Sequence, residues 1–270
     1  MLARLVHPSV EEAPLNALSE ARRLIIPPAG DRDGPLVPLL LILTVVTGLV
    51  DAFSFLALGH VFVANATGNV VFLAFALAGA HGFSIGASVL ALTAFSAGAL
   101  AGGRTIALLG SDRARLLAVA TAAEALFVVG AVLLARGSTG LDAGWLRYAL
   151  IGVLAAPMGL QNAVARRLAV ADLTTTVLTL TLTAISADSG LAGGQGSRLG
   201  RRLPALLAML LGALIGGWLV VSGRAPIDLA IAAAGLVAVA AATVVAARAD
   251  PPWARPAASR DAAAGVRTGQ

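Results

Sequence analysis

The chain has 270 residues, of which 58% are hydrophobic and only 12% are charged, and its mean hydropathy is +0.89. Several runs of about 20 residues are uniformly apolar, whereas an amphipathic helix of a soluble protein needs a polar outer face. The composition therefore predicts an integral membrane protein and excludes an ordinary soluble domain, which carries about 25% charged residues. Because the chain contains no cysteine, it has no disulfide, thiolate metal site or cysteine nucleophile.

The basic residues indicate a membrane surface rather than nucleic acid as the partner. All 19 are arginine, the net charge is +5, and the arginines lie beside apolar runs. Anionic lipid and insertion topology account for that placement. The expected partners are the lipid bilayer and an unknown small solute, with no nucleic acid, and a homo-oligomer is an open alternative. No HExxH pair, phosphate-binding P-loop or GxSxG elbow is present, so we expect no enzyme, no metal and no cofactor.

In chain order, residues 1–36 mix Glu, Arg, Pro and Asp without a continuous apolar core, and we predict a cytoplasmic tail rather than a signal peptide. Residues 249–270 are rich in Pro, Ala and Arg, which predicts a disordered tail near the membrane surface. Eight apolar segments lie between the tails, at 38–58, 61–80, 84–103, 116–135, 146–165, 172–188, 203–222 and 229–247.

Two of these segments are not expected to cross the membrane. The 15 residues between Asp172 and Asp188 form a helix of about 22 Å, shorter than the hydrocarbon core of about 30 Å. If 172–188 and 61–80 both enter and return, most loop arginines fall on the inner side, as the positive-inside rule expects. We therefore favour six full spans plus two broken or re-entrant helices, with both tails cytoplasmic. Seven spans, with 61–80 crossing, and eight spans are the alternatives.

Three motifs recur in the same order along the chain. GLVDAFSF (48–55) is similar to GLQNAVAR (159–166), VANATGNVV (63–71) to VADLTTTVL (170–178), and GALAGGR (98–104) to GALIGGW (212–218). The offsets are 111, 107 and 114 residues. They indicate duplication of a four-segment unit, with membrane repeats at 37–136 and 137–248, and chance resemblance between two Ala- and Gly-rich halves is the alternative. With three crossings per unit the repeats are inverted, an arrangement typical of transporters with discontinuous helices.

Polar residues inside the apolar segments are the candidates for a substrate site. Asp51 lies deep in the first span, where a carboxylate is costly unless it is paired, protonated or hydrated. It either binds a solute or a proton, or caps and tethers the broken helix that follows. The remaining candidates of the first repeat are the groups that allow a helix to break: Asn65, Thr67, Gly68 and Asn69.

The second repeat has its own polar cluster. Gln161 and Asn162 either line a cavity or join helices. Asp172, Thr174, Thr175 and Thr176 repeat the polar motif with other side chains, although a threonine can satisfy itself on a carbonyl one turn back. Glu124, in the middle of its segment, is with Asp51 a proton-coupling candidate, and an interhelical hydrogen bond is the alternative. The small-residue pairs of the third motif, Gly98 with Gly102 and Gly212 with Gly216, are better explained by helix packing.

The stretches TGLVDAFSFLALGHVFVANATGNVVFLAFAL and GLQNAVARRLAVADLTTTVLTLTLT resemble the YoaK-like family of bacterial integral membrane proteins, a family of unknown function. The resemblance covers residues 38–247 and implies a multi-pass protein of the bacterial inner membrane. It supplies no site residues. From the residues themselves, our functional hypothesis is a small-solute transporter or channel with a central polar site formed by 51–69 and 161–176. A non-transporting membrane scaffold or sensor is the alternative.

Overall fold

The computed structural model describes residues 22, 26–28, 31, 33–110, 112–137, 144–170, 178–189, 199–248 and 252–254. Over these residues the chain folds into α-helices and one short 3-10 turn, with no strand. The elements are α2 (Leu36–Ala57), α3 (Ala66–Leu77), α4 (Ile85–Leu109), α5 (Arg113–Gly137), α6 (Gly144–Leu168), α7 (Leu178–Ala187), α8 (Leu199–Val221), α9 (Ala225–Ala247) and η2 (Pro252–Ala254).

Helix length separates the membrane-spanning elements from the others. Within the described residues, α2, α4, α5, α6, α8 and α9 are long and apolar enough to cross a membrane. By contrast, α3 has 12 residues and α7 has 10, or about 18 Å and 15 Å of helix, well short of a hydrocarbon core of about 30 Å. The prediction of a polytopic helical bundle with six spans and two short elements is confirmed. The seven- and eight-span alternatives need α3 to cross, and it is too short to do so.

The break between α2 and α3 has a local cause. Gly59 and His60 adopt positive φ angles of 84° and 58°, which ends α2 and turns the chain. Residues 61–65 then run without helical structure until Asn65 caps α3, its side chain accepting a hydrogen bond from the backbone N–H of Gly68. An Asn at this position satisfies a helix donor that would otherwise have no partner in lipid.

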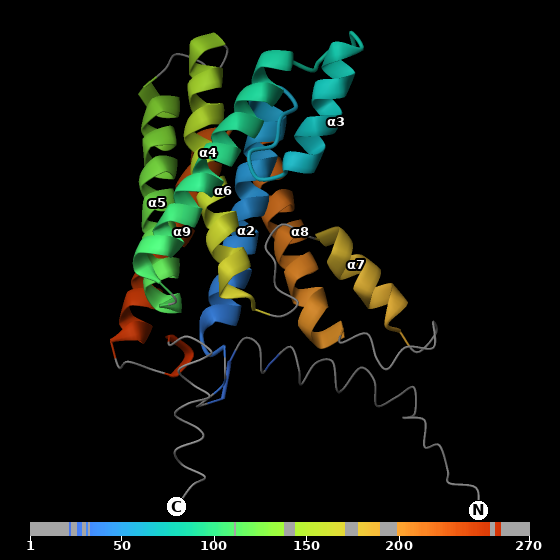
Figure 1. Cartoon of the computed structure of the whole chain (residues 1–270). Helices are drawn as coiled ribbons and strands as arrows, with labels where there is room; N and C mark the ends of the chain where they lie inside the picture. Colours follow the sequence, from blue (N-terminus) through green and yellow to red (C-terminus); the bar gives the residue numbers. More distant parts are fainter. Residues whose placement is uncertain are drawn as a thin grey trace, which may run out of the picture.

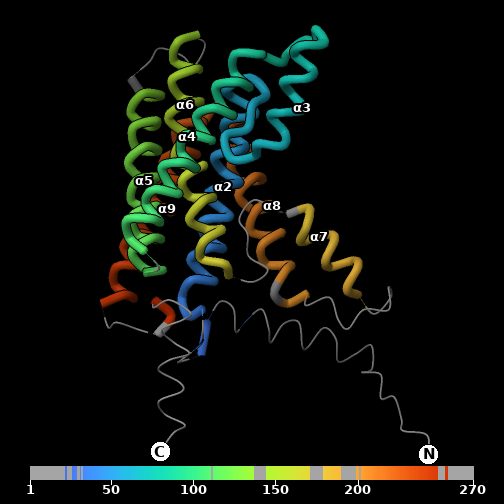
Figure 2. Tube along the Cα trace, viewed as in Figure 1, coloured from blue at the N-terminus to red at the C-terminus, as the bar shows by residue number. Residues whose placement is uncertain are grey.

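The main helix contacts join the two halves of the chain rather than forming within each half. α2 packs chiefly against α8 and then α9, while α6 packs chiefly against α4 and then α5. If α2, α3, α4 and α5 are matched in order with α6, α7, α8 and α9, the contacts of α2 with α8 and α9 correspond to the contacts of α6 with α4 and α5. The short helices obey the same relation, since α3 packs on α4 and α7 packs on α8. Figures 1 and 2 show α3 and α7 at opposite ends of the bundle, as an inverted repeat requires.

Two glycine crossings show this symmetry residue by residue. A Cβ on Gly48 of α2 would lie 2.6 Å from the carbonyl oxygen of Met209 in α8. A Cβ on Gly159 of α6 would collide with the carbonyl oxygen of Phe95 in α4. Gly48 and Gly159 are 111 residues apart, and Phe95 and Met209 are 114 apart, which are the offsets of the sequence motifs. The same close helix contact is therefore built twice.

The repeated small-residue motif makes the reciprocal contacts. A Cβ on Gly98 would collide with the carbonyl oxygen of Ala156, and one on Gly212 would collide with that of Val45. Val45 and Ala156 are again 111 residues apart. Small residues let helix backbones approach closely, and this drives helix association in lipid, where apolar contact alone gives no preference. These glycines are packing residues, as their spacing suggested.

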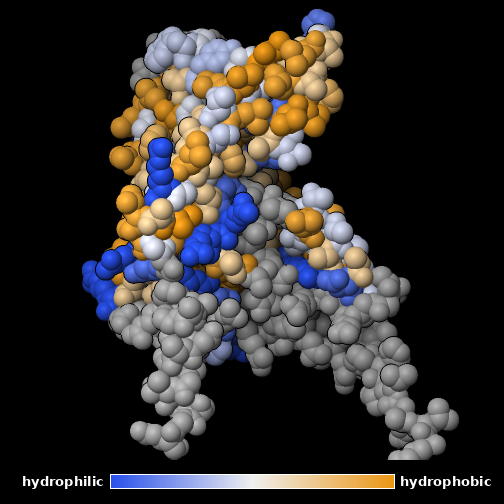
Figure 3. Space-filling model, viewed as in Figure 1, coloured by the Kyte–Doolittle hydropathy of each residue, from blue (hydrophilic) through white to orange (hydrophobic). Residues whose placement is uncertain are grey.

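The outside of the bundle is apolar, as a lipid-facing surface must be. On the face seen in Figure 3, hydrophobic side chains cover α3 and α4, and hydrophilic ones gather toward the end where the chain termini are drawn. The outermost helices expose large apolar side chains, namely Leu100 and Leu108 of α4 and Leu210, Leu214, Trp218 and Val221 of α8. In water such a surface would be unfavourable, and in a bilayer it is solvated by lipid tails.

A buried arginine closes the end of the bundle near the termini. Arg113, at the start of α5, donates to Asp33 Oδ1 at 2.9 Å and to the carbonyl oxygen of Leu168 at 3.0 Å. Trp253, in the segment predicted to be a tail, is buried and packs on Gly34 in the turn before α2. Residues 33–34 before the first span and Trp253 after the last span are thus both attached to the membrane bundle.

Candidate functional site

Asp51 faces the protein interior and holds the chain break in place. Its side chain is 4% exposed, and Oδ1 accepts a hydrogen bond from the backbone N–H of Ala64 at 2.9 Å. The N–H of Ala64 lies in the non-helical stretch before α3 and has no helical partner of its own. The carboxylate therefore gives the Ala64 N–H a hydrogen bond that neither α2 nor α3 provides. This is the tethering role that the sequence left as one of two options.

Asn69 makes a second tether from the other side of the break. Its Oδ1 accepts from the backbone N–H of Phe62 at 2.9 Å, and its Nδ2 donates to the carbonyl oxygen of Phe62. The side chain is buried, so both hydrogen bonds form out of water. One amide thus replaces both backbone partners that Phe62 would have had in a continuous helix.

The other polar residues of the first repeat are more accessible. Asn65 and Thr67 are exposed, and Gly68 is partly buried beneath the ring of Phe62. Asn65 uses its side-chain oxygen for the helix cap, which leaves its amide nitrogen for other partners. Among the predicted residues of this repeat, Asn65 and Thr67 are thus the exposed ones.

An aromatic cluster packs around the chain break. The ring of Phe55 at the end of α2 stacks on Phe62 with centroids 4.9 Å apart. Phe72 of α3 lies 5.6 Å from Phe62 and 5.3 Å from Phe83, so the cluster joins α2, α3 and the approach to α4. His60 contacts the same cluster through Phe55 and bonds the carbonyl oxygen of Gly82 through Nδ1 at 3.0 Å. These rings hold α3 against the end of α2 and the approach to α4.

The structure pairs one predicted residue of each repeat, Glu124 of the first and Gln161 of the second. Glu124 of α5 and Gln161 of α6 are both buried, and with its amide nitrogen toward α5 Gln161 donates to both carboxylate oxygens, to Oε1 at 2.7 Å. Asn162, the counterpart of Asp51, donates through Nδ2 to the carbonyl oxygen of Met158 one turn back. Asp172, Thr174, Thr175 and Thr176 lie outside the described residues.

The two polar clusters lie at different depths. Asp51 is six residues before the end of α2, and Asn162 is six residues before the end of α6, so each is about 9 Å from the end of its helix. Because α2 and α6 run in opposite directions (Figure 2), the two clusters lie toward opposite ends of the bundle. Among the described residues, the polar groups therefore do not lie at a single level.

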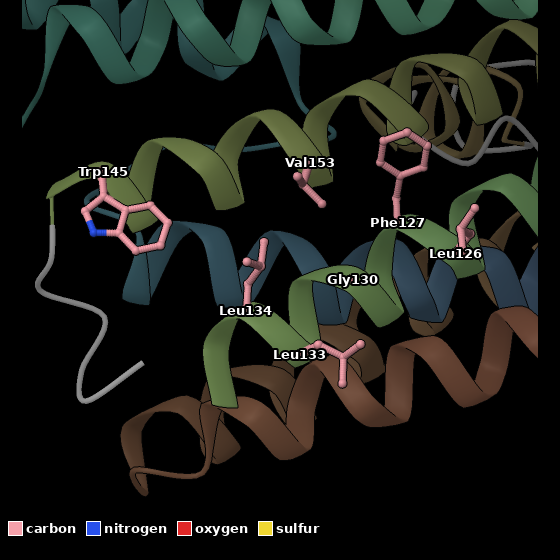
Figure 4. Close-up of a pocket in the computed structure, with 7 residues that line it drawn as sticks. All are labelled: Leu126, Phe127, Gly130, Leu133, Leu134, Trp145 and Val153. Atoms are coloured by element: carbon pink, nitrogen blue, oxygen red, sulfur yellow. The ribbon is translucent and has the colours of Figure 1, made fainter. Parts of the chain in front are cut away.

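A prominent pocket lies away from all of these residues. It has a volume of about 710 Å³ and lies between α5 and α6 (Figure 4). Its lining is apolar and consists of Leu126, Phe127, Gly130, Leu133, Leu134, Trp145 and Val153. None of the predicted site residues lines it. Such a surface suits lipid tails rather than a polar solute.

Asp228 is a buried carboxyl that the sequence analysis missed. It lies in the first turn of α9, is fully buried, and neither of its oxygens has a hydrogen-bond partner among the described residues. The apolar segment predicted at 229–247 begins one residue later and places Asp228 in the preceding loop. The signal that could have found it is Pro226, since proline favours the first turn of a helix and indicates a start near residue 225.

The described residues contain no group of three or more His, Asp or Glu side chains that could hold a metal ion. Unlike Asp228, the buried side chains of Asp51, Asn69, Glu124 and Gln161 bond backbone atoms or each other. The buried threonines behave in the same way, since Thr44, Thr47, Thr121 and Thr243 each donate to the carbonyl four residues earlier. Six apolar spans with internal polar contacts and an inverted repeat define a polytopic α-helical membrane protein.

Comparison with known proteins gives the family. Residues 39–243 match the model of the family described as "Protein of unknown function (DUF1275)", and the chain belongs to this family. It is also similar to the UPF0700 transmembrane protein YoaK of Bacillus subtilis (strain 168), with 32% identity over 158 residues. That match covers 56% of this chain and 65% of the relative, somewhat less than two thirds of its length. No solved structure matches the chain.

Proposed function

We propose that this protein carries a small solute across the bacterial inner membrane by exchanging two conformations related by its inverted repeat. The observation that supports this most directly is the duplicated helix crossing, Gly48 on α8 and Gly159 on α4. In an inverted repeat, each half can adopt the conformation of the other, which opens the site to the opposite side of the membrane. The two polar clusters at different depths fit this mode of access.

In this proposal, the residues around each chain break form the solute site. Asp51 and Asn69 hold the break open, and Asn65 and Thr67 offer polar groups to the solute. The counterpart in the second repeat includes Asn162 together with Asp172 and Thr174 to Thr176. Irregular backbone is tolerated at membrane depth only where protein or a water-filled cavity satisfies it. Proton coupling through Asp51 or Glu124 is part of the same proposal.

The arginines indicate the orientation. The start of α5 and α8 and the end of α4, α6 and α9 share one end of the bundle (Figure 1). That end carries Arg104, Arg113, Arg115, Arg166, Arg167, Arg201, Arg202 and Arg248. The opposite end carries Arg136, Arg147 and Arg224. By the positive-inside rule the first end faces the cytoplasm, which supports cytoplasmic placement of both chain ends.

Labelling of single cysteines tests transport without knowledge of the solute. The natural chain has no cysteine, so Asn65→Cys and Thr67→Cys each provide one reactive group. A membrane-impermeant maleimide is applied to one side of oriented vesicles at a time. We expect at least one of these positions to react from both sides, because alternating access exposes the site to each side in turn. Reaction from one side only, at both positions, contradicts the proposal.

Leu100→Cys is the matched control, since Leu100 is 70% exposed on the outer face of α4 and is expected to lie in lipid. It should react from neither side with the impermeant reagent. Flux is then measured with vesicles that contain the protein, using glycerol, urea, amino acids and simple sugars as probes and light scattering as the readout. A probe that enters faster than into protein-free vesicles, with a saturating rate, identifies the solute class.

A membrane scaffold or sensor is the second candidate function, and the contacts of Asp33 and Trp253 with α5 favour it. Trp253 and Asp33 connect residues outside the spans to Arg113 of α5, so a partner bound there would contact the bundle directly. Deletion of 1–30 and 255–270 preserves these contacts and removes the tails. A transporter should keep its labelling pattern and flux after this deletion, whereas a scaffold that works through its tails should lose its cellular phenotype.

A further inference from the structure

Three buried carboxyl groups lie inside the spans, and their surroundings differ. Asp51 accepts a hydrogen bond from Ala64, and Glu124 accepts from Gln161. Both oxygens of Asp228 lack a hydrogen-bond partner within the described part of the chain. A carboxyl group accepts a stronger hydrogen bond as a carboxylate than as an acid, so a change of protonation costs part of any structural contact that the group supports. Asp228 has no such contact to lose.

We propose that Asp228 is a proton-binding site, at which the carboxylate takes up and releases a proton as the seam between α2, α8 and α9 opens and closes. This inference deepens the proposed transport function and rests on it for the opening motion. In the closed arrangement seen here, no donor is present to compensate a charge on Asp228, whereas a carboxylic acid carries none. A bare charge in such surroundings costs several kcal/mol.

The packing at Gly216 of α8 shows where the proton is held. A Cβ on Gly216 would lie 3.0 Å from Asp228 Oδ1 and 3.0 Å from the Cβ of Ala52 in α2. The missing side chain is therefore what lets the carboxyl group sit in the seam between three helices. Gly102, the counterpart of Gly216 in the first repeat, instead faces the Cβ of Ala163 and has no carboxyl group beside it. The feature belongs to one repeat only.

A short route connects Asp228 to water. The residue lies about 6 Å, or one helical turn, from the exposed cap residue Arg224. The guanidinium of Arg224 lies 5.6 Å from the ring centre of Trp218 at the end of α8. A proton from water at this end needs to pass only the first turn of α9 to form an O–H bond on one carboxyl oxygen. The reverse transfer restores the carboxylate.

The charged groups on the neighbouring helices do not contact Asp228 in this arrangement. The helices packed on α9 are α2, α5 and α8. Their charged side chains are Asp51 of α2, Arg113, Arg115, Glu124 and Arg136 of α5, and Arg201 and Arg202 of α8. No ion pair or hydrogen bond joins any of the described side chains among them to Asp228. Arg136 and Arg224 are the ones at the same end of the bundle, where they keep other cations away from the site.

Infrared spectroscopy of the full chain in phosphatidylethanolamine–phosphatidylglycerol vesicles tests the site directly. The absorption of protonated carboxyl carbonyls is followed between acidic and alkaline pH in the natural protein, in Asp228→Asn, and in the controls Asp51→Asn and Glu124→Gln. We expect the natural protein minus D228N difference to contain a pH-dependent contribution of one carboxyl group, and we expect the same contribution to be present in D51N and E124Q, whatever other carboxyl bands those two changes remove. A D228N spectrum that matches the natural protein at every pH overturns the proposal, and so does an Asp228 contribution that never changes with pH.

Three further variants keep the test decisive. If D228N does not fold, Asp228→Glu should shift the frequency of the pH-dependent band, and an unshifted band overturns the assignment. Gly216→Ala should change the pH midpoint of the band, while Gly102→Ala should leave it unchanged. If Asp228 titrates but Asn65→Cys and Thr67→Cys react from one side only, the transport proposal is wrong and the proton site is supported. If labelling occurs from both sides but Asp228 does not titrate, the proton site is wrong and the transport proposal is supported.

Discussion

The carboxylate of Asp51 and the backbone N–H of Ala64 are joined by a 2.9 Å hydrogen bond that spans 13 residues of the chain. The bond lets α2 end inside the membrane region and the chain return as α3 with its backbone groups satisfied. A single acidic residue in an apolar span is thereby explained by the geometry of the chain break. The same bond also decides how variants at this position should behave.

Asp51→Ala should destabilise the protein by about 1–3 kcal/mol, because the buried N–H of Ala64 is left without a partner. Asp51→Asn should cost less, since the amide oxygen can accept the same hydrogen bond. Thermal unfolding in detergent measures the order of the three proteins. Equal stability of D51A and the natural protein would show that the tether contributes nothing.

The glycine crossings predict matched effects in the two repeats. Gly98→Ala and Gly212→Ala each place a methyl group against a backbone carbonyl of the partner helix, so each should cost about 1–3 kcal/mol. Gly103→Ala is the control, because nothing lies near its Cβ position and alanine favours a helix by about 1 kcal/mol. The measurement is the unfolding temperature in detergent. A loss of stability in only one of G98A and G212A would contradict the packing symmetry.

The contact between Glu124 and Gln161 predicts a swap experiment. Gln161→Glu places a second carboxyl group against Glu124 in a buried position and should destabilise the protein by several kcal/mol. The double variant Glu124→Gln with Gln161→Glu restores one carboxyl and one amide and should recover most of the loss. The coupling is measured as a double-mutant cycle of unfolding free energies. Additive effects of the two changes would mean that the side chains do not interact.

Arg113 should matter more than its neighbour Arg115. Arg113→Gln removes a buried charged donor from Asp33 and from the carbonyl of Leu168, so a loss of about 1.5–3 kcal/mol is expected. Arg115 forms an exposed pair with Asp112, and Arg115→Gln should change stability by less than about 0.5 kcal/mol. Proteolysis near Trp253 gives a second readout, because release of Arg113 loosens its contact with the Trp253 carbonyl. Similar behaviour of the two variants would refute this account.

The sequence alone predicted the membrane class, favoured six long spans over seven or eight, and located the break between α2 and α3. These features follow from local energetics: backbone groups in lipid must be satisfied within each segment, and a helix must be about 20 residues long to cross. The repeated GALAGG and GALIGG stretches also indicated close packing before any partner was known. The sequence also predicted a helix break at Asn65 and Asn69, and the structure shows the side-chain hydrogen bonds of both residues at that break.

Only the tertiary structure decided which helices meet. The pairing of α2 with α8 and of α4 with α6 and the contact of Glu124 with Gln161 depend on neighbours more than 30 residues away. The unpartnered state of Asp228 likewise depends on how α2 and α8 pack against α9. Lipid tails are as apolar as leucine side chains, so hydrophobicity places a helix in the membrane without choosing its neighbour. That choice comes from the fit of one backbone against another at a few glycines, and the fit exists only once the helices are assembled.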